Sequence, residues 1–139
     1  MQQKFKTITL STSGAGLYEF TAEAEKLVNE SKVRDGLMTV FVQHTSASLL
    51  VQENADPEVR RDLERFFRRL VPEGDTLFRH TTEGPDDMPA HVRSALTATT
   101  LGIPVMNGRL VLGTWQGIYL YEHRAQPHRR RIVMHVFGE

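Results

Sequence analysis

Apolar residues recur along the chain with two different periods. Residues 37–42 form a β-branched and aromatic segment that predicts a buried strand. Residues 130–137 alternate between the two faces of a final strand. A helical period begins after Asp56 and Pro57, a capping side chain followed by proline at the first helical position. The apolar residues at helical spacing in this segment are Val59, Leu63, Phe66, Phe67 and Leu70.

Shorter patterns complete the predicted architecture. Residues 4–10 predict a strand, and residues 17–20 are expected to pair back against it. Asn107-Gly108 is the strongest hairpin signal in the chain. Further strands are expected at 49–51, 109–112 and 118–122, and further helices at 21–31 and 90–99. About eight strands and three helices predict one α+β domain over residues 1–139, with its last four strands largely antiparallel.

The composition narrows the classes of function. The 17 basic and 17 acidic residues give a formal net charge of zero, which argues against nonspecific nucleic-acid binding. The arginines of the helix after Asp56 are interleaved with Glu58, Asp62 and Glu64, so this basic face is expected to be solvated. The N-terminus lacks an apolar leader and no segment approaches the length of a membrane span, so we expect a cytoplasmic protein without membrane contact.

One segment, residues 80–91, predicts a functional site. It holds two histidines, three carboxylates, one glycine and two prolines, and therefore has almost nothing to bury. Pro89 is suited to the first position of a helix that runs from Ala90 to about Thr99. Asp86 and Asp87 precede this helix, where their carboxylates can cap free backbone N–H groups or face a cation.

Three histidines are candidate metal ligands. The chain has no cysteine, so a metal must be held by His, Asp or Glu. His44, His80 and His91 each lie at a polar turn, and three imidazoles with one open position are a common catalytic zinc arrangement. Asp87, Glu83 or Asp86 could add a carboxylate. The spacing carries no known metal signature, so hydrogen-bonded surface histidines are the alternative interpretation.

Other polar groups have less specific patterns. Ser46 and Ser48 lie beside His44, where hydroxyl groups could hold phosphate, and the lack of a Gly-x-Ser-x-Gly motif argues against a nucleophilic serine. Trp115, with Gln116 beside it, could belong to the core, stack on a planar heterocycle or pack on a neighbouring subunit. The strand end Glu122-His123-Arg124 could act as acid, base or phosphate clamp, or could form a surface ion pair.

Several long motifs resemble the YjbQ-like family. They follow in the same order over nearly the whole chain, and no motif residue is missing. The matching segments are His44-Thr45-Ser46-Ala47-Ser48-Leu49, Glu53-Asn54-Ala55-Asp56-Pro57, Glu83-Gly84, Asp86-Asp87-Met88-Pro89-Ala90-His91, Asn107-Gly108-Arg109-Leu110, Leu112-Gly113-Thr114-Trp115-Gln116-Gly117-Ile118-Tyr119-Leu120 and Glu122-His123-Arg124.

The resemblance implies a β-sandwich-like core, a homotrimer and a secondary thiamine-phosphate synthase, which joins hydroxymethylpyrimidine diphosphate to thiazole phosphate. It makes His44, His80 and His91 metal ligands, with zinc as the expected ion. Around them it places Asp87, Asn54, Glu122 and Arg124, with Arg124, Ser46 and Ser48 as candidate diphosphate contacts and Trp115 facing the pyrimidine. A metal-dependent hydrolase of a small phosphorylated molecule and a non-catalytic binding trimer remain alternatives.

Overall fold

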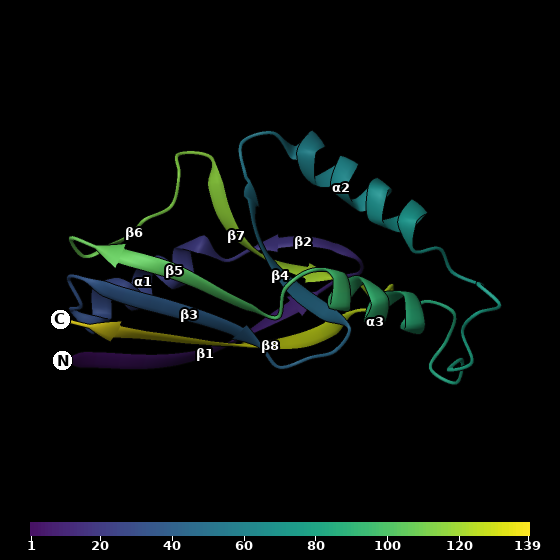
Figure 1. Cartoon of the computed structure of the whole chain (residues 1–139), viewed down its shortest axis with the longest axis horizontal. Coiled ribbons are helices and arrows are strands. Elements are labelled where there is room, and N and C mark those ends of the chain that lie inside the picture. The colour runs from purple at the N-terminus through teal and green to yellow at the C-terminus, as the bar shows by residue number, and fades with distance from the viewer.

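The computed structural model describes residues 1–139, which form two antiparallel sheets and three helices (Figure 1). The larger sheet has the strand order β1-β8-β3-β5-β6, and the smaller sheet has the order β2-β7-β4. The strands are β1 (Gln2–Thr12), β2 (Gly16–Glu19), β3 (Gly36–Val42), β4 (Ala47–Glu53), β5 (Thr100–Met106), β6 (Arg109–Leu110), β7 (Gln116–Glu122) and β8 (His128–Gly138). The helices are α1 (Thr21–Ser31), α2 (Pro57–Leu70) and α3 (Asp87–Leu96).

The core lies between the two sheets and under α1. Strands β3 and β8 alternate strictly, and they turn Met38, Val40, Met134 and Val136 inward, each with no more than 1% of its surface exposed. The helix α1 adds Ala24, Leu27 and Val28 to the same cluster. Alternation at a period of two therefore produces the sandwich-like core that the family resemblance implies.

One strand pairing differs from the prediction. The segment that becomes β2 pairs with β7, in the register Leu17↔Tyr121, and not with β1. Strand β1 instead pairs along its whole length with β8, from Gln2↔Gly138 to Thr12↔His128. The turn after β1 therefore moves the chain from the larger sheet to the smaller one. The predicted Asn107-Gly108 hairpin is confirmed, because Asn107 and Gly108 both have positive φ, at 53° and 77°.

Helix α2 begins where the sequence predicts and is exposed along its length. The Asp56 carboxylate accepts a hydrogen bond from the Glu58 N–H at 2.9 Å, and Pro57 is the first helical residue. No residue of α2 is buried, and Arg68 pairs with Glu64 on its surface. The prediction that its basic face is solvated is confirmed.

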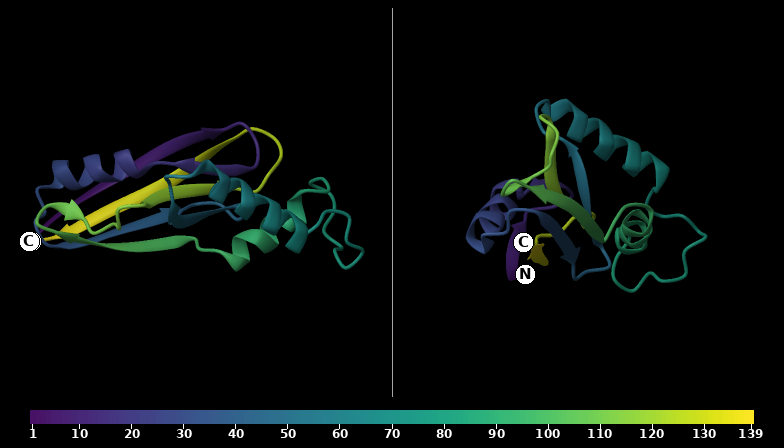
Figure 2. Two further views of the ribbon diagram at one scale, coloured as in Figure 1. Left: turned by 90° about the horizontal axis from the view of Figure 1, so that it is seen from above. Right: turned by 60° about the vertical axis from the view of Figure 1, so that its left-hand side comes forward.

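Helix α3 begins earlier than predicted, at Asp87 instead of Ala90, so Pro89 is its third residue. Asp86 occupies the N-cap position but its side chain makes no capping bond. The views of Figure 2 place α3 and the loop of residues 71–86 at one end of an elongated molecule, opposite the end that holds both termini. No helix is long and apolar enough to cross a membrane.

Candidate functional site

Two histidines and one aspartate meet at the start of α3. The Nε2 atom of His80 lies 3.0 Å from Oδ2 of Asp87, and Nε2 of His91 lies 3.1 Å from the same oxygen. The three candidate ligand atoms all lie within 4.8 Å of one another. Asp87 and His91 are four residues apart on one helix and so share a face. The Asp87 side chain is 4% exposed, while that of His80 is 50% exposed. The carboxylate of the cluster is therefore buried, and one of its imidazoles is open to solvent.

The hydrogen bonds of His91 fix its tautomer. Its Nδ1 lies 3.0 Å from the carbonyl oxygen of Thr45, which can only accept, so Nδ1 carries a proton. In the neutral ring, Nε2 then presents a lone pair to the Asp87 carboxylate at 3.1 Å. Two lone pairs repel at this separation. A cation, either a proton or a metal ion, must therefore lie between His91 and Asp87 in the stable arrangement.

The dimensions of the cluster fit a zinc-sized ion. Zinc bonds to imidazole and carboxylate of about 2.0–2.2 Å, in a tetrahedral arrangement, separate the ligand atoms by about 3.3–3.6 Å. The two separations from Oδ2 of Asp87, 3.0 and 3.1 Å, are slightly shorter than this, and the two imidazole nitrogens lie within 4.8 Å of each other. A ligating histidine that donates its other N–H to a carbonyl oxygen is also the usual support of such a site.

Arg124 holds the carboxylates next to the cluster in place. Its Nη1 donates to Oδ1 of Asp87 at 2.9 Å and its Nε donates to Oδ2 of Asp86 at 3.0 Å. Burial raises the pKa of Asp86, but the hydrogen bonds from Arg124 and from the Ala125 N–H outweigh it, and the pKa lies below its ordinary value. This pairing explains why Asp86 does not cap α3. Arg124 leaves Oδ2 of Asp87 facing the two imidazoles.

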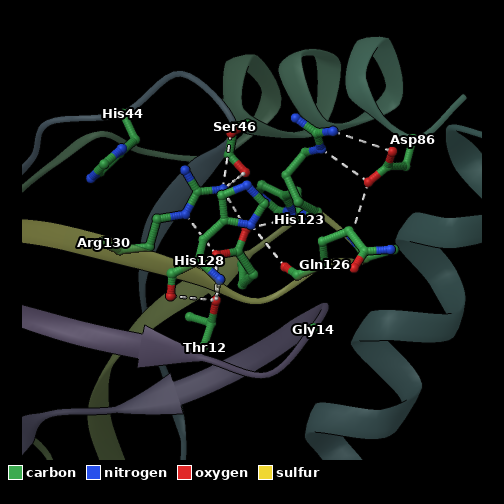
Figure 3. A network of polar contacts seen from close by, with 12 residues as sticks. Thr12, Gly14, His44, Ser46, Asp86, His123, Gln126, His128 and Arg130 are labelled. Atoms are coloured by element: carbon green, nitrogen blue, oxygen red, sulfur yellow. Dashed lines mark hydrogen bonds and ion pairs between the residues drawn. The ribbon is translucent and has the colours of Figure 1, made fainter. Parts of the chain in front are cut away.

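Glu122 lies in a buried part of the polar network, which Arg124 connects to Asp86, and Figure 3 shows Thr12, Ser46, Asp86 and Arg130 of this network. Glu122 is 0% exposed, and its Oε2 accepts hydrogen bonds from Thr12 at 2.9 Å and from Nε of Arg130 at 2.6 Å. Arg130 also donates to the Ser46 hydroxyl at 2.9 Å. Burial raises the pKa of Glu122, yet the bonds from Arg130 and the Arg124 N–H lower it further than burial raises it. Glu122 therefore connects β7 to β8, and Ser46 connects the segment before β4 to β8; neither side chain bonds to His80, Asp87 or His91.

Ser48 is fully buried and contacts His123, which belongs to the strand end Glu122-His123-Arg124. Its Oγ lies 2.8 Å from Nε2 of His123 and 2.6 Å from the Thr97 hydroxyl. The ring of His123 is 2% exposed, so this chain of three groups is inside the domain. The sequence predicts a charged strand end at residues 122–124, and the structure instead buries His123 directly after β7.

The structure does not bring His44 to the cluster. Its Nε2 accepts a hydrogen bond from the Arg131 N–H at 2.8 Å, beside β8, and Figure 3 shows it set apart from the neighbouring network. Burial and the nearby Arg130 lower the pKa of His44. Within the chain, the predicted set of three imidazoles is therefore corrected to two imidazoles and the carboxylate of Asp87.

Asn54, Trp115 and Gln116 form a third group, where β4 ends and β7 begins. The Asn54 N–H donates to the Trp115 carbonyl oxygen at 2.9 Å, and the Gln116 side chain accepts from the Gly113 N–H at 2.7 Å. Trp115 is 62% exposed, which excludes the core interpretation and leaves its ring free to contact a ligand or a second subunit. No hydrogen bond connects this group to the histidine cluster.

The fold and the cluster define a class of protein, a small α+β two-sheet domain with a His/Asp site at the start of one helix. The chain belongs to the UPF0047 protein YjbQ-like family, which matches residues 6–139. A UPF0047 protein of Synechocystis sp. is 54% identical over 99% of this chain and 94% of its own. The UPF0047 protein YjbQ of Escherichia coli O157:H7 is 47% identical over 96% of this chain and 97% of its own.

Solved structures agree with this assignment. An uncharacterized conserved protein of the YjbQ/UPF0047 family from Clostridium acetobutylicum superposes with a TM-score of 0.88 at 36% identity, over 95% of this chain and 99% of the other. The expected YjbQ-like fold is thereby confirmed. Membership of this family establishes the fold of the chain. Any reaction that the protein catalyses is inferred from the residues of the histidine cluster.

Proposed function

We propose that His80, Asp87 and His91 bind one divalent transition metal ion and that the protein is a metal-dependent hydrolase of a small phosphorylated molecule. The observation that carries the proposal is the His91 tautomer. Its Nδ1 proton is committed to Thr45, so its Nε2 lone pair faces a carboxylate and calls for a cation between them. Two imidazoles favour zinc over magnesium, which prefers oxygen ligands and keeps its waters.

Three protein ligands are the number that catalytic zinc sites use, with a further position left for water or substrate. When bound, such an ion acts as a Lewis acid toward a phosphoryl oxygen. Asp87 is the ligand that Arg124 orients, because Arg124 occupies Oδ1 and leaves Oδ2 toward the imidazoles. Arg124 is therefore a positioning residue in this proposal.

A pocket of about 270 Å³ adjoins the cluster on the His80 side. Phe78, Met88 and Pro89 give it apolar walls, while His80 and Thr81 supply polar groups. This volume lies just below the range of about 300–1,000 Å³ that is typical of small-molecule sites. A substrate of a few heavy atoms beyond its phosphate group fits this space best.

Thiamine-phosphate synthesis, which the family resemblance implies, is the second candidate. It needs cationic and hydroxyl groups for a diphosphate, and the residues expected to supply them are engaged elsewhere. Ser46 bonds to Arg130, Ser48 bonds to His123, and Arg124 is bonded to both Asp86 and Asp87. Hydrolysis needs none of these groups to be free, and we therefore place it first.

The test is an activity screen of the chelated protein after addition of zinc, manganese or cobalt. Substrates are small phosphate monoesters, and hydroxymethylpyrimidine diphosphate with thiazole phosphate forms a separate assay. The hydrolase proposal predicts metal-dependent phosphate release that falls at least about 100-fold in His91→Ala and is kept in His44→Ala. Thiamine phosphate formation alone would replace the hydrolase, and metal binding without either reaction would leave a non-catalytic binding protein.

We also propose that the chain assembles as a homotrimer, as the resemblance implies. The outer face of the larger sheet exposes Phe5, Phe41 and Phe137 at 61%, 46% and 37%, and Met106 lies exposed on β5. A group of exposed aromatic residues on one face of a sheet is typical of surfaces that another chain covers. Light scattering after size-exclusion chromatography should give three times the 15.8 kDa chain mass, and Phe41→Glu should lower it. A monomer at micromolar concentration in the unmodified protein would contradict the assembly.

A further inference from the structure

The histidine cluster is supported from two sides by residues outside α3. On one side, the Thr45 carbonyl oxygen accepts the Nδ1 proton of His91 at 3.0 Å. On the other side, Nη1 of Arg124 donates to Oδ1 of Asp87 at 2.9 Å. Thr45 lies in the turn before β4, whereas Arg124 follows β7. The shape of the cluster therefore depends on how these two supports are held relative to each other.

The Thr45 carbonyl is held through the next residue, Ser46. This carbonyl belongs to the planar peptide unit that ends at the Ser46 nitrogen, so its direction depends on the Ser46 backbone. Nη2 of Arg130 donates to the Ser46 hydroxyl at 2.9 Å and to the Ser46 carbonyl oxygen at 3.3 Å. Both residues are buried, with Arg130 4% exposed and Ser46 9% exposed. Arg130 therefore fixes the residue beside the support of His91.

Arg124 is held at its backbone by Glu122. The Arg124 N–H donates to Oε1 of Glu122, two residues earlier in the chain, at 3.1 Å. This bond folds the chain directly after β7 and sets the direction in which the Arg124 side chain leaves the backbone. The buried Glu122 carboxylate also pairs with Arg130, through Nε at 2.6 Å and through Nη2. The two supports of the cluster therefore meet at one buried ion pair.

The Glu122 carboxylate accepts hydrogen bonds from four donors. Its Oε1 accepts from the Arg124 N–H and Nη2 of Arg130, and its Oε2 accepts from the Thr12 hydroxyl and Nε of Arg130. Each oxygen faces one N–H of Arg130, so an amide in the same place would direct its NH₂ group at an N–H donor in either orientation. Glu122→Gln therefore keeps the shape of the side chain and breaks the junction.

We propose that Glu122 and Arg130 are positioning residues for the metal site, because their ion pair fixes the Thr45 carbonyl and the Arg124 guanidinium relative to each other. This role rests on the proposed metal site at the histidine cluster. Neither residue of the pair bonds to a proposed metal ligand. The pair acts through the two supports, which direct one imidazole nitrogen and one carboxylate oxygen at the same point.

The first test measures the zinc affinity of the folded, full-length protein by competition with a chelator. We expect Glu122→Gln to bind zinc about tenfold more weakly, at the lower end of the loss that outer contacts of a metal site cause. Val136→Ala is the matched control, because Val136 is a buried residue of β8 at the end opposite Arg130, paired with Lys4. The control should lower stability and leave zinc affinity unchanged. Cobalt bound in place of zinc should show altered visible absorption bands only in Glu122→Gln, because these bands report the arrangement of the ligands.

The second test needs no metal. In chelated, ¹⁵N-labelled protein at one fixed pH, the NMR signals of Nδ1 of His91 and Nε of Arg124 report the two supports. We expect both signals to shift in Glu122→Gln and to stay in place in Val136→Ala. Ser46→Ala removes only the bond at the Ser46 hydroxyl, so it should shift the His91 signal and leave the Arg124 signal unchanged.

The outcomes separate the positioning role from the metal site itself. Equal zinc affinity of Glu122→Gln and the unmodified protein would overturn the positioning role and leave the metal site standing. No zinc uptake by the unmodified protein would overturn the metal site, and the NMR signals would then decide whether the pair holds the two supports. If Glu122→Gln does not fold, an unmoved His91 signal in Ser46→Ala overturns the positioning role.

Discussion

The buried pair of Glu122 and Arg130 gives the sharpest prediction about stability. Glu122 is 0% exposed and Arg130 is 4% exposed, and Arg130 is the only cationic side chain bonded to that carboxylate. Arg130→Met would leave a buried charge with only Thr12 and the Arg124 N–H as partners. Removing one member of a buried pair costs about 3–5 kcal/mol. This is a large share of the roughly 5–15 kcal/mol that holds a typical domain folded.

Urea unfolding at pH 7.5 and at pH 4 measures this cost. The pKa of Glu122 in the folded protein lies below its ordinary value of 4.5, so its contribution is present above that value and is lost as the pH falls below it. In Arg130→Met the folded-state pKa should rise instead, so the difference from the unmodified protein should shrink toward pH 4. Arg61→Met, in an exposed pair with Glu58, is the control and should change little. A loss below 1 kcal/mol at pH 7.5 would refute the assigned role of the pair.

Three further predictions follow from single contacts. Burial and the neighbouring Arg93 lower the pKa of His123 to about 3, so its ¹⁵N signals should not titrate between pH 8 and 5, and a midpoint near 6.5 would contradict its burial. Arg124→Met should weaken metal binding about 10–100-fold in a chelator competition, because Asp87 loses its support. Asp56→Ala should cost about 1 kcal/mol in urea unfolding, because the Glu58 N–H loses its cap, and no loss would contradict the cap.

Much of the fold could be predicted because it depends on local patterns. The Asp56-Pro57 helix start, the Asn107-Gly108 hairpin and the alternation of residues 130–137 each need only neighbouring residues, and the structure confirms them. The pairing of β2 with β7 was missed because it joins segments about 100 residues apart. The start of α3 was missed for a similar reason, since the Asp86 side chain is engaged by Arg124 and not by the helix.

The sequence predicts where the candidate site lies, but it does not predict which residues form it. Segment 80–91 does hold the clustered groups His80, Asp87 and His91, because polar residues between turns have nothing else to pack against. His44 is also an imidazole at a polar turn, like His80 and His91. Its distance from the cluster depends on the tertiary fold, which places it beside β8. Ser48 was a candidate phosphate contact, but it is fully buried and bonded to Thr97 directly after α3.

Elemental analysis of the purified protein tests the central claim most directly. The account predicts about one zinc or other transition metal ion per chain, removed by chelation and restored by titration. His91→Ala and Asp87→Asn should each lose the ion while they keep the fold, and His44→Ala should retain it, because His44 bonds to the Arg131 N–H and lies outside the cluster. Protein that takes up no metal during titration, or equal loss in His44→Ala and His91→Ala, would contradict the site as described.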